Sequence, residues 1–129
     1  MTPPTAVPSF SVHLHHEDGW LRVVCEGTPG LADLCGASQL VATVAEMRGC
    51  RRALIDLVDT APELSFTEHL QLGAHIAQSR ARLDCVATVV STANRTGSSE
   101  KAAQKNGLHL RTFTDPAEAR QWIERKGAE

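Results

Sequence analysis

Apolar and polar residues alternate with two different periods along the chain, and the changes of period predict its secondary structure. Residues 9–16 and 20–27 alternate at every second position, which is the period of a half-buried strand. The segment between them is short and contains Gly19, a residue that adopts positive φ without strain. We therefore expect an antiparallel hairpin. The apolar residues that share a face are Val12 and Leu14 in the first strand, and Leu21, Val23 and Cys25 in the second.

The following segments have the helical period or are apolar throughout. Residues 31–48 predict a helix with Thr28 and Pro29 as start signals and Gly49 as the stop. Residues 53–58 predict a strand that is apolar on both faces, as a central parallel strand covered on both sides must be. The residues expected on the buried stripe of the helix are Leu34, Leu40, Val41, Val44 and Met47.

A second helix is predicted to begin at Ser65. Glu68 follows three residues later, and a Ser and a Glu at this spacing form a capping box in which each side chain accepts a hydrogen bond from the backbone of the other residue. The apolar segment at 85–91 then predicts another central strand. The residues expected on the apolar face of this helix are Leu70, Ala74, Ile76 and Ala77.

The last third of the chain predicts one more strand between two helices. A short helix that Gly107 ends precedes residues 108–113, whose alternating pattern is typical of an edge strand. Asp115 then has the position of an N-cap, and Pro116 has the first helical position that proline favours. The residues of this last helix expected to face the core are Ala119, Trp122 and Ile123.

The predicted element order is ββαβαβαβα, which places the chain in the α/β class. We expect a single domain with a mixed sheet of about five strands, in which an N-terminal hairpin precedes right-handed βαβαβα crossovers. Residues 1–9 are rich in proline and are expected to form a flexible leader, and residues 10–126 the domain. A chain of 129 residues has the size at which one hydrophobic core suffices.

Charge and hydropathy exclude two classes of partner. The net charge of −2 comes from interspersed acids and bases, so no basic face is present for nucleic acid. The longest apolar runs are far shorter than the roughly 20 residues that span a bilayer, and no secretion signal is evident. We therefore expect a cytoplasmic protein.

The four cysteines of the chain form no close pair of the kind that binds zinc, so we expect buried thiols at Cys25, Cys35, Cys50 and Cys85.

The segment GLHLRTFTDPAEARQWI, together with the strand ALIDL and the hairpin segment GWLRVVCEG, resembles the bacterial SpoIIAA-like family. This family is related to the STAS domains of anti-sigma factor antagonists, and the resemblance covers about residues 11–124. It implies a mixed sheet with amphipathic helices beside it. STAS antagonists have a phosphorylatable Ser in a D-S-S-G segment before the second helix; the corresponding segment here, DLVDTAPELSF, is longer and lacks the Gly, and Ser65 is the nearest counterpart.

Several polar residues follow the two central strands, where the open sheets of α/β proteins bind ligands. Asp56 and Asp59 are candidates for holding a metal ion or acting as a general base, or else they only bond the backbone of a loop and of a turn before Pro62. Ser65 is a candidate for phosphorylation, or only caps a helix. A candidate anion site at the start of the third helix is formed by Arg95, Thr96, Ser98 and Ser99.

Other chemistry has weaker support in the sequence. His13 and His15 share a strand face at a spacing that suits two metal ligands, but no third ligand has a zinc-type spacing, so we expect exposed histidines and no metal or other cofactor. We expect a non-catalytic regulatory module that binds an unidentified protein through the face around residues 59–68. The alternatives are a binder of a small anionic molecule or a lipid, of the CRAL-TRIO type, and a metal-dependent hydrolase. The residues leave open whether two copies form a homodimer.

Overall fold

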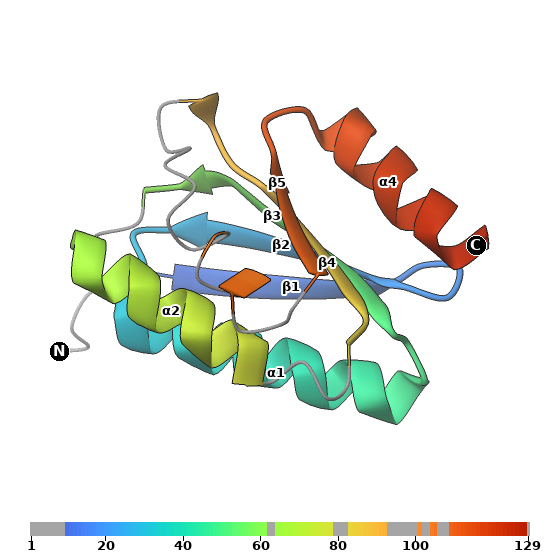
Figure 1. Ribbon diagram of the computed structural model, residues 1–129, viewed down its shortest axis with the longest axis horizontal. Coiled ribbons are helices and arrows are strands. Elements are labelled where there is room, and N and C mark those ends of the chain that lie inside the picture. The colour runs from blue at the N-terminus through green and yellow to red at the C-terminus, as the bar shows by residue number, and fades with distance from the viewer. Residues whose placement is uncertain are drawn as a thin grey trace, which may run out of the picture.

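The computed structural model describes residues 10–61, 64–78, 83–92, 101, 104–105 and 109–128 of the chain. These residues contain five strands and three long helices (Figure 1). In chain order they are β1 (Phe10–His16), β2 (Leu21–Gly27), α1 (Leu31–Arg48), β3 (Arg52–Thr60), α2 (Phe66–Gln78), β4 (Cys85–Val89), β5 (His109–Phe113) and α4 (Pro116–Ala128).

The five strands form one mixed sheet in which the spatial order equals the chain order, β1-β2-β3-β4-β5. β1 is antiparallel to β2, and every later neighbouring pair is parallel. The predicted hairpin, the parallel central strands and the edge position of β5 are therefore confirmed. A shared strand direction requires each crossover to return to the same end of the sheet, so the carboxyl ends of β2 to β5 all lie at one edge.

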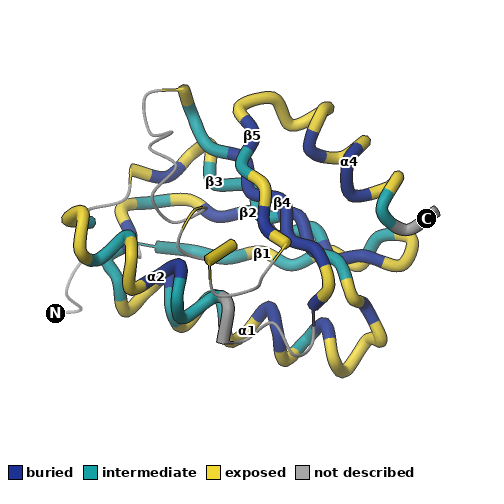
Figure 2. The backbone as a smooth tube through the Cα atoms, viewed as in Figure 1, coloured by how far each residue is buried: buried dark blue, intermediate teal, exposed yellow. Residues whose placement is uncertain are grey.

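Helices cover both faces of the sheet, which gives three layers (Figure 1). Of the three long helices described, α1 and α2 lie together on one face and α4 lies on the other. The strand alternation matches this arrangement, since Leu21 and Val23 belong to the core on the α1/α2 side whereas Trp20 belongs to the core on the α4 side. β4 is buried along its whole length, because it is covered on both faces (Figure 2).

The helix ends follow from local sequence. Ser65 N–H donates to Glu68 Oε1 at 3.0 Å, and Glu68 N–H donates to Ser65 Oγ at 3.2 Å, so the predicted capping box of α2 is confirmed. The predicted cap of α4 is also confirmed, because Ala117 N–H donates to Asp115 Oδ1 at 3.0 Å. Gly49 ends α1 with φ of 69°, as expected.

α1 begins at Leu31 and ends at Arg48, as predicted, but its capping residue was not anticipated. Its N-cap is Gly30, so neither Thr28 nor Pro29 is the last residue before the helix. The carboxylate of Asp33 accepts a hydrogen bond from Gly30 N–H at 3.0 Å. An acid in the first turn therefore satisfies a backbone donor in place of a capping hydroxyl.

The predicted apolar stripes were partly wrong. Leu40 and Met47 of α1 have exposed fractions of 46% and 78%, and Leu70 of α2 has one of 40%. At about 100° per residue, Leu40 and Met47 lie roughly 100–120° around the helix from the buried Val41, so they are outside the stripe that faces the sheet. The residues that α1 does bury are Leu34, Val41, Ala42 and Ala45.

The predicted short helix before Gly107 lies largely outside the described residues. Lys101, Gln104 and Lys105 are helical, and the Gln104 side chain donates from Nε2 to the carbonyl oxygen of Leu110 at 2.8 Å. Gly107 itself lies outside the described residues. Within the described ranges, none of the helices has the length and apolar character needed to cross a bilayer.

Candidate functional site

Asp56 lies in a β-bulge near the carboxyl end of β3. β2 residues Val24 and Glu26 pair with Asp56 and Asp59, so β3 has one more residue than its partner over this interval. Such an insertion leaves one backbone group without a ladder partner. The Asp56 carboxylate accepts a hydrogen bond from Val58 N–H at 3.0 Å and so satisfies that donor. This contact supports the prediction that Asp56 binds a backbone N–H group. The donor, however, lies in the same strand and not in a loop.

Asp59 lies inside β3, not in the predicted turn before Pro62. The strand runs two residues past its predicted end, because Thr60 pairs with Gly27 and Ala61 N–H donates to the carbonyl oxygen of Gly27 at 2.9 Å. Asp59 is exposed and stands opposite Glu26 in the ladder. Two carboxylates are therefore neighbours on adjacent strands at the carboxyl end of the sheet.

The start of α2 combines a polar cap with exposed apolar residues. Ser65 is exposed although its hydroxyl takes part in the capping box. Phe66, the first residue of the helix, has an exposed fraction of 69%, and Leu70 follows one turn later with 40%. Residues at i and i+4 lie side by side on a helix surface. We call Ser65, Phe66 and Leu70 the α2 start surface. The sequence pattern predicted Ser65 as a candidate residue here, but it placed Leu70 on the apolar face of the helix.

The remaining candidates for an anion site lie outside the described residues. Arg95, Thr96, Ser98 and Ser99 all belong to that part of the chain. β3 and β4 are parallel neighbours, so the segments that follow them leave the sheet at the same edge. Convergence of these residues with Asp59 stays a prediction.

His13 and His15 are exposed on the edge strand β1, as expected. His13 pairs with Val24 and His15 with Arg22 of β2. Across the described part of the chain, no group of three or more His, Cys, Asp or Glu side chains is close enough to hold a metal ion.

A cleft at the opposite end of the sheet was not anticipated from the sequence. It has a volume of about 300 Å³ and lies at the amino ends of β3 and β4. A signal was present in the sequence, because Arg51-Arg52 and Asp84-Cys85 each stand directly at the start of a strand, and parallel strands bring such starts together. The side chains that line the cleft are those of Arg51, Arg52, Asp84, Cys85 and Lys126.

One ion pair joins the two strand starts beside this cleft. Arg51 donates from Nε to Asp84 Oδ2 at 2.7 Å and from Nη2 to Asp84 Oδ1 at 2.9 Å, which is a bidentate pair. The hydrogen bonds from Arg51 and its charge hold the pKa of Asp84 below its ordinary value, and the same contact raises the pKa of Arg51. Both side chains are exposed, so the pair orients the strand starts more than it stabilises them.

The four cysteines all lie in the described ranges, and no disulfide joins any two of them. Cys25, Cys50 and Cys85 are buried, as predicted, whereas Cys35 on α1 is only half-buried. Burial, with the Asp56 carboxylate adding to it, raises the pKa of Cys25 to about 12. Burial also raises the pKa of Cys35 and of Cys50. These three thiols therefore stay protonated at neutral pH.

Comparison with known proteins identifies the fold. An anti-sigma factor antagonist from Mycobacterium paratuberculosis superposes with a TM-score of 0.62 at 13% identity, over 92% of this chain and 98% of that one. An uncharacterized DUF3478-family protein with a SpoIIAA-like fold, from Shewanella loihica, superposes with a TM-score of 0.58 at 17% identity, over 95% of this chain and 99% of that one. No family model matches the sequence, and neither does any curated protein. The chain thus has the SpoIIAA-like, or STAS-like, fold that the sequence resemblance implied.

Proposed function

We propose that this chain is a non-catalytic regulatory module that binds a protein partner through the α2 start surface. The proposal is supported by one observation above all, the exposure of Phe66 at the first position of α2. The chain has three phenylalanines, and this one has an exposed fraction of 69% while Phe113 is buried. A large exposed ring is the kind of side chain that a partner's pocket can bury.

The neighbours of Phe66 suit a recognition surface. Leu70 extends the apolar contact by one helical turn, and Ser65 with Glu68 adds a polar rim before it. Central apolar anchors with polar residues around them are typical of protein interfaces. The fold shared with an anti-sigma factor antagonist agrees with a regulatory role, since the name of that protein describes one that acts through other proteins.

Ser65 gives this surface a means of control. A phosphate on the Ser65 hydroxyl would add negative charge at a helix amino end, where the helix dipole favours it. It would also lie beside the Glu68 carboxylate that now accepts the Ser65 N–H. The capping box would therefore rearrange, and Phe66 is the next residue along the chain.

Partner capture with matched variants tests the proposal. The full chain is immobilised, lysate of the source cell is passed over it, and retained proteins are quantified by mass spectrometry. Phe66→Gln and Leu70→Gln should each reduce retention of the partner by about thirtyfold, the effect of losing an interface anchor worth roughly 2 kcal/mol.

Met47→Gln is the matched control for this experiment. Met47 is also exposed, at 78%, but it lies near the end of α1 and not on the α2 start surface. The Met47 variant should retain the partner at the wild-type level, with circular dichroism showing that all three variants are folded. Equal retention by wild type, Phe66→Gln and Leu70→Gln would overturn the proposal.

A further inference from the structure

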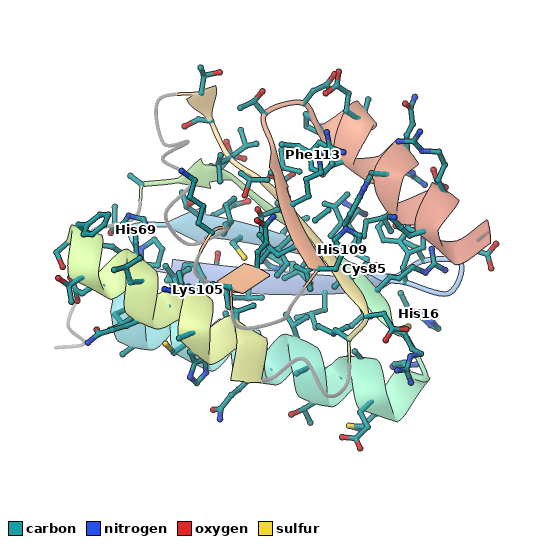
Figure 3. The ribbon with its side chains drawn as sticks, viewed as in Figure 1. His16, His69, Cys85, Lys105, His109 and Phe113 are labelled. Atoms are coloured by element: carbon teal, nitrogen blue, oxygen red, sulfur yellow. The ribbon has the colours of Figure 1, made fainter. Side chains whose placement is uncertain are left out.

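A cysteine and a histidine lie side by side at the amino ends of β4 and β5. Cys85 and His109 are register partners on these adjacent strands, and Cys85 Sγ lies 3.8 Å from His109 Nδ1 (Figure 3). Arg52 of β3 is the register partner of Cys85 on its other side. Three parallel strands therefore present a guanidinium, a thiol and an imidazole in one row on the face that α4 covers.

The imidazole of His109 is held in position by an aromatic contact. Its ring meets the Trp122 ring edge to face, with centroids 5.1 Å apart and an interplanar angle of 87°. Trp122 belongs to α4 and is buried, whereas His109 is exposed. The ring is thus fixed against a rigid element while solvent still reaches it.

The cleft described above gives access to Cys85. Cys85 has an exposed fraction of only 8%, but it is one of the residues that line this opening of about 300 Å³. A small molecule can therefore reach the thiol through the cleft, whereas the surface of another protein cannot. Of the other thiols, Cys25 and Cys50 are each 2% exposed, and the pKa values of Cys25, Cys35 and Cys50 are raised by burial.

The cleft also has an excess of positive charge. Among the described residues that line it, Arg51, Arg52 and Lys126 are cationic and Asp84 is the one acid. Asp84 is engaged by Arg51 in the bidentate pair, whereas Arg52 donates from Nη1 to Ile123 O at 2.7 Å and from Nη2 to Gly19 O at 3.4 Å. Carbonyl groups orient Arg52 without neutralising its charge. A molecule with carboxylates is therefore attracted to the opening beside Cys85.

From this arrangement we infer that Cys85 and His109 form a thiol–disulfide exchange site for small disulfides that carry carboxylate groups. His109 accepts the Cys85 proton, and the thiolate attacks one sulfur of the disulfide. A new S–S bond forms to Cys85 as the original S–S bond breaks, and the departing thiolate takes the proton from the imidazolium. The products are a mixed disulfide on Cys85 and one small thiol, so the disulfide is the only oxidant required.

Exchange with oxidised glutathione tests the inference, because this disulfide carries carboxylates. The full chain is incubated with it, and adducts are counted by intact mass and located by peptide mapping. Cys85 should react at least about tenfold faster than Cys35, although Cys35 is the more exposed thiol, since reactivity follows thiolate formation and not exposure alone. Cys85→Ser should abolish the fast adduct, and Cys35→Ser should leave it unchanged.

Two further comparisons separate the roles of His109 and of the cleft charges. His109→Gln should slow exchange by about tenfold or more at neutral pH and move its pH profile upward, as loss of a proton acceptor requires. Cystamine, a disulfide without carboxylates, should react about tenfold more slowly than oxidised glutathione, and Lys126→Gln should reduce that preference.

Three results would overturn the inference. They are labelling of Cys35 as fast as Cys85, an unchanged rate and pH profile in His109→Gln, and equal rates with the two disulfides. Circular dichroism of each variant distinguishes these results from unfolding. The outcome is independent of partner binding at the α2 start surface, because the two sites lie at opposite ends of the sheet.

Discussion

The cores on the two sides of the sheet consist of different kinds of side chain. On the α1/α2 side two helices cover the sheet, and the buried core consists of aliphatic residues and thiols. On the α4 side one helix of 13 residues covers it, and both tryptophans of the chain are found there. The buried core residues are Leu21, Val23, Cys25, Val41, Ala45, Cys50, Ala53, Leu83, Val86 and Leu110 on the α1/α2 side, and Trp20, Leu54, Cys85, Ala87, Val89, Phe113, Ala119, Trp122 and Ile123 on the α4 side.

The difference shows how, of the long helices described, α4 covers one face of the sheet by itself, whereas α1 and α2 cover the other face together. A single short helix supplies few inward positions, so each must fill more space, and aromatic rings bury the largest area per residue. Cations also lie over the faces of these rings: the distance to the ring centroid is 5.1 Å for Arg111 over Phe113, 5.6 Å for Arg120 over Trp20 and 5.7 Å for Lys126 over Trp122. Stability on the α4 side is therefore concentrated in a few residues, and one of them, Trp122, is also the residue that holds the His109 ring.

The largest effect that tests this comparison is expected for Trp122→Ala. Removing the indole leaves a large cavity under α4, and we expect a loss of about 3–5 kcal/mol in the free energy of unfolding. Val41→Ala is the matched change on the other side, where the loss of two methyl groups should cost roughly 2–3 kcal/mol. Urea denaturation followed by circular dichroism measures both values.

Equal losses for the two variants would contradict the concentration of stability on the α4 side. A larger loss for Val41→Ala would reverse the comparison. A change in the denaturant slope for Trp122→Ala alone would sharpen it, because this would show that α4 detaches before the rest of the domain unfolds.

Much of this architecture was predictable because local and global signals agree. The period-two hairpin, the apolar central strand at β4 and the caps at Ser65 and Asp115 each require a particular backbone, and the structure has it. The inward face of α1 was harder to predict. Leu40 and Met47 are apolar, yet whether a side stripe of a helix is covered depends on the neighbouring helix, which no local pattern describes.

The candidate sites were predictable only where chemistry is local. Ser65 as a helix cap follows from its own segment, whereas the bulge at Asp56 depends on the register with β2. The row of Arg52, Cys85 and His109 joins three strands that are far apart in the sequence. Its recognition requires knowing which residues of neighbouring parallel strands pair with one another, whereas hydrophobic alternation assigns each residue only to a face of the sheet.

An intermediate effect is expected for Gly19→Ala, which acts on the α4 side through Arg52. Gly19 has φ of 80°, and a Cβ there would lie 3.0 Å from Arg52 Nη2. Alanine at positive φ costs about 1–2 kcal/mol, and displacement of Arg52 should weaken its bond to Ile123 O by roughly a further 1 kcal/mol. Gly49→Ala, at the end of α1, is the control.

Gly49 has a similar φ of 69°, and no atom lies within 4 Å of the added Cβ. Gly49→Ala should therefore show the cost of the backbone alone, about 1–2 kcal/mol. Thermal unfolding of the two variants measures the difference between them. If Gly19→Ala were the less destabilised of the two, the link from the hairpin turn through Arg52 to α4 would have no energetic importance.

The smallest effect is expected for Asp84→Asn, because the ion pair with Arg51 belongs to neither core and is exposed to solvent. The pKa of Asp84 is lower in the folded chain than its ordinary value of 3.8, so its contribution to stability is present above that pH and is lost as the pH falls through the folded pKa. Asp84→Asn should therefore lower the unfolding temperature slightly at pH 7 and have no effect in strong acid. A deficit that persisted in acid would contradict this account, because it would show that the contribution of Asp84 does not come from its charge. Either result leaves the two cores as the main source of stability, since an exposed pair at the strand starts adds orientation to a sheet that its helices already hold.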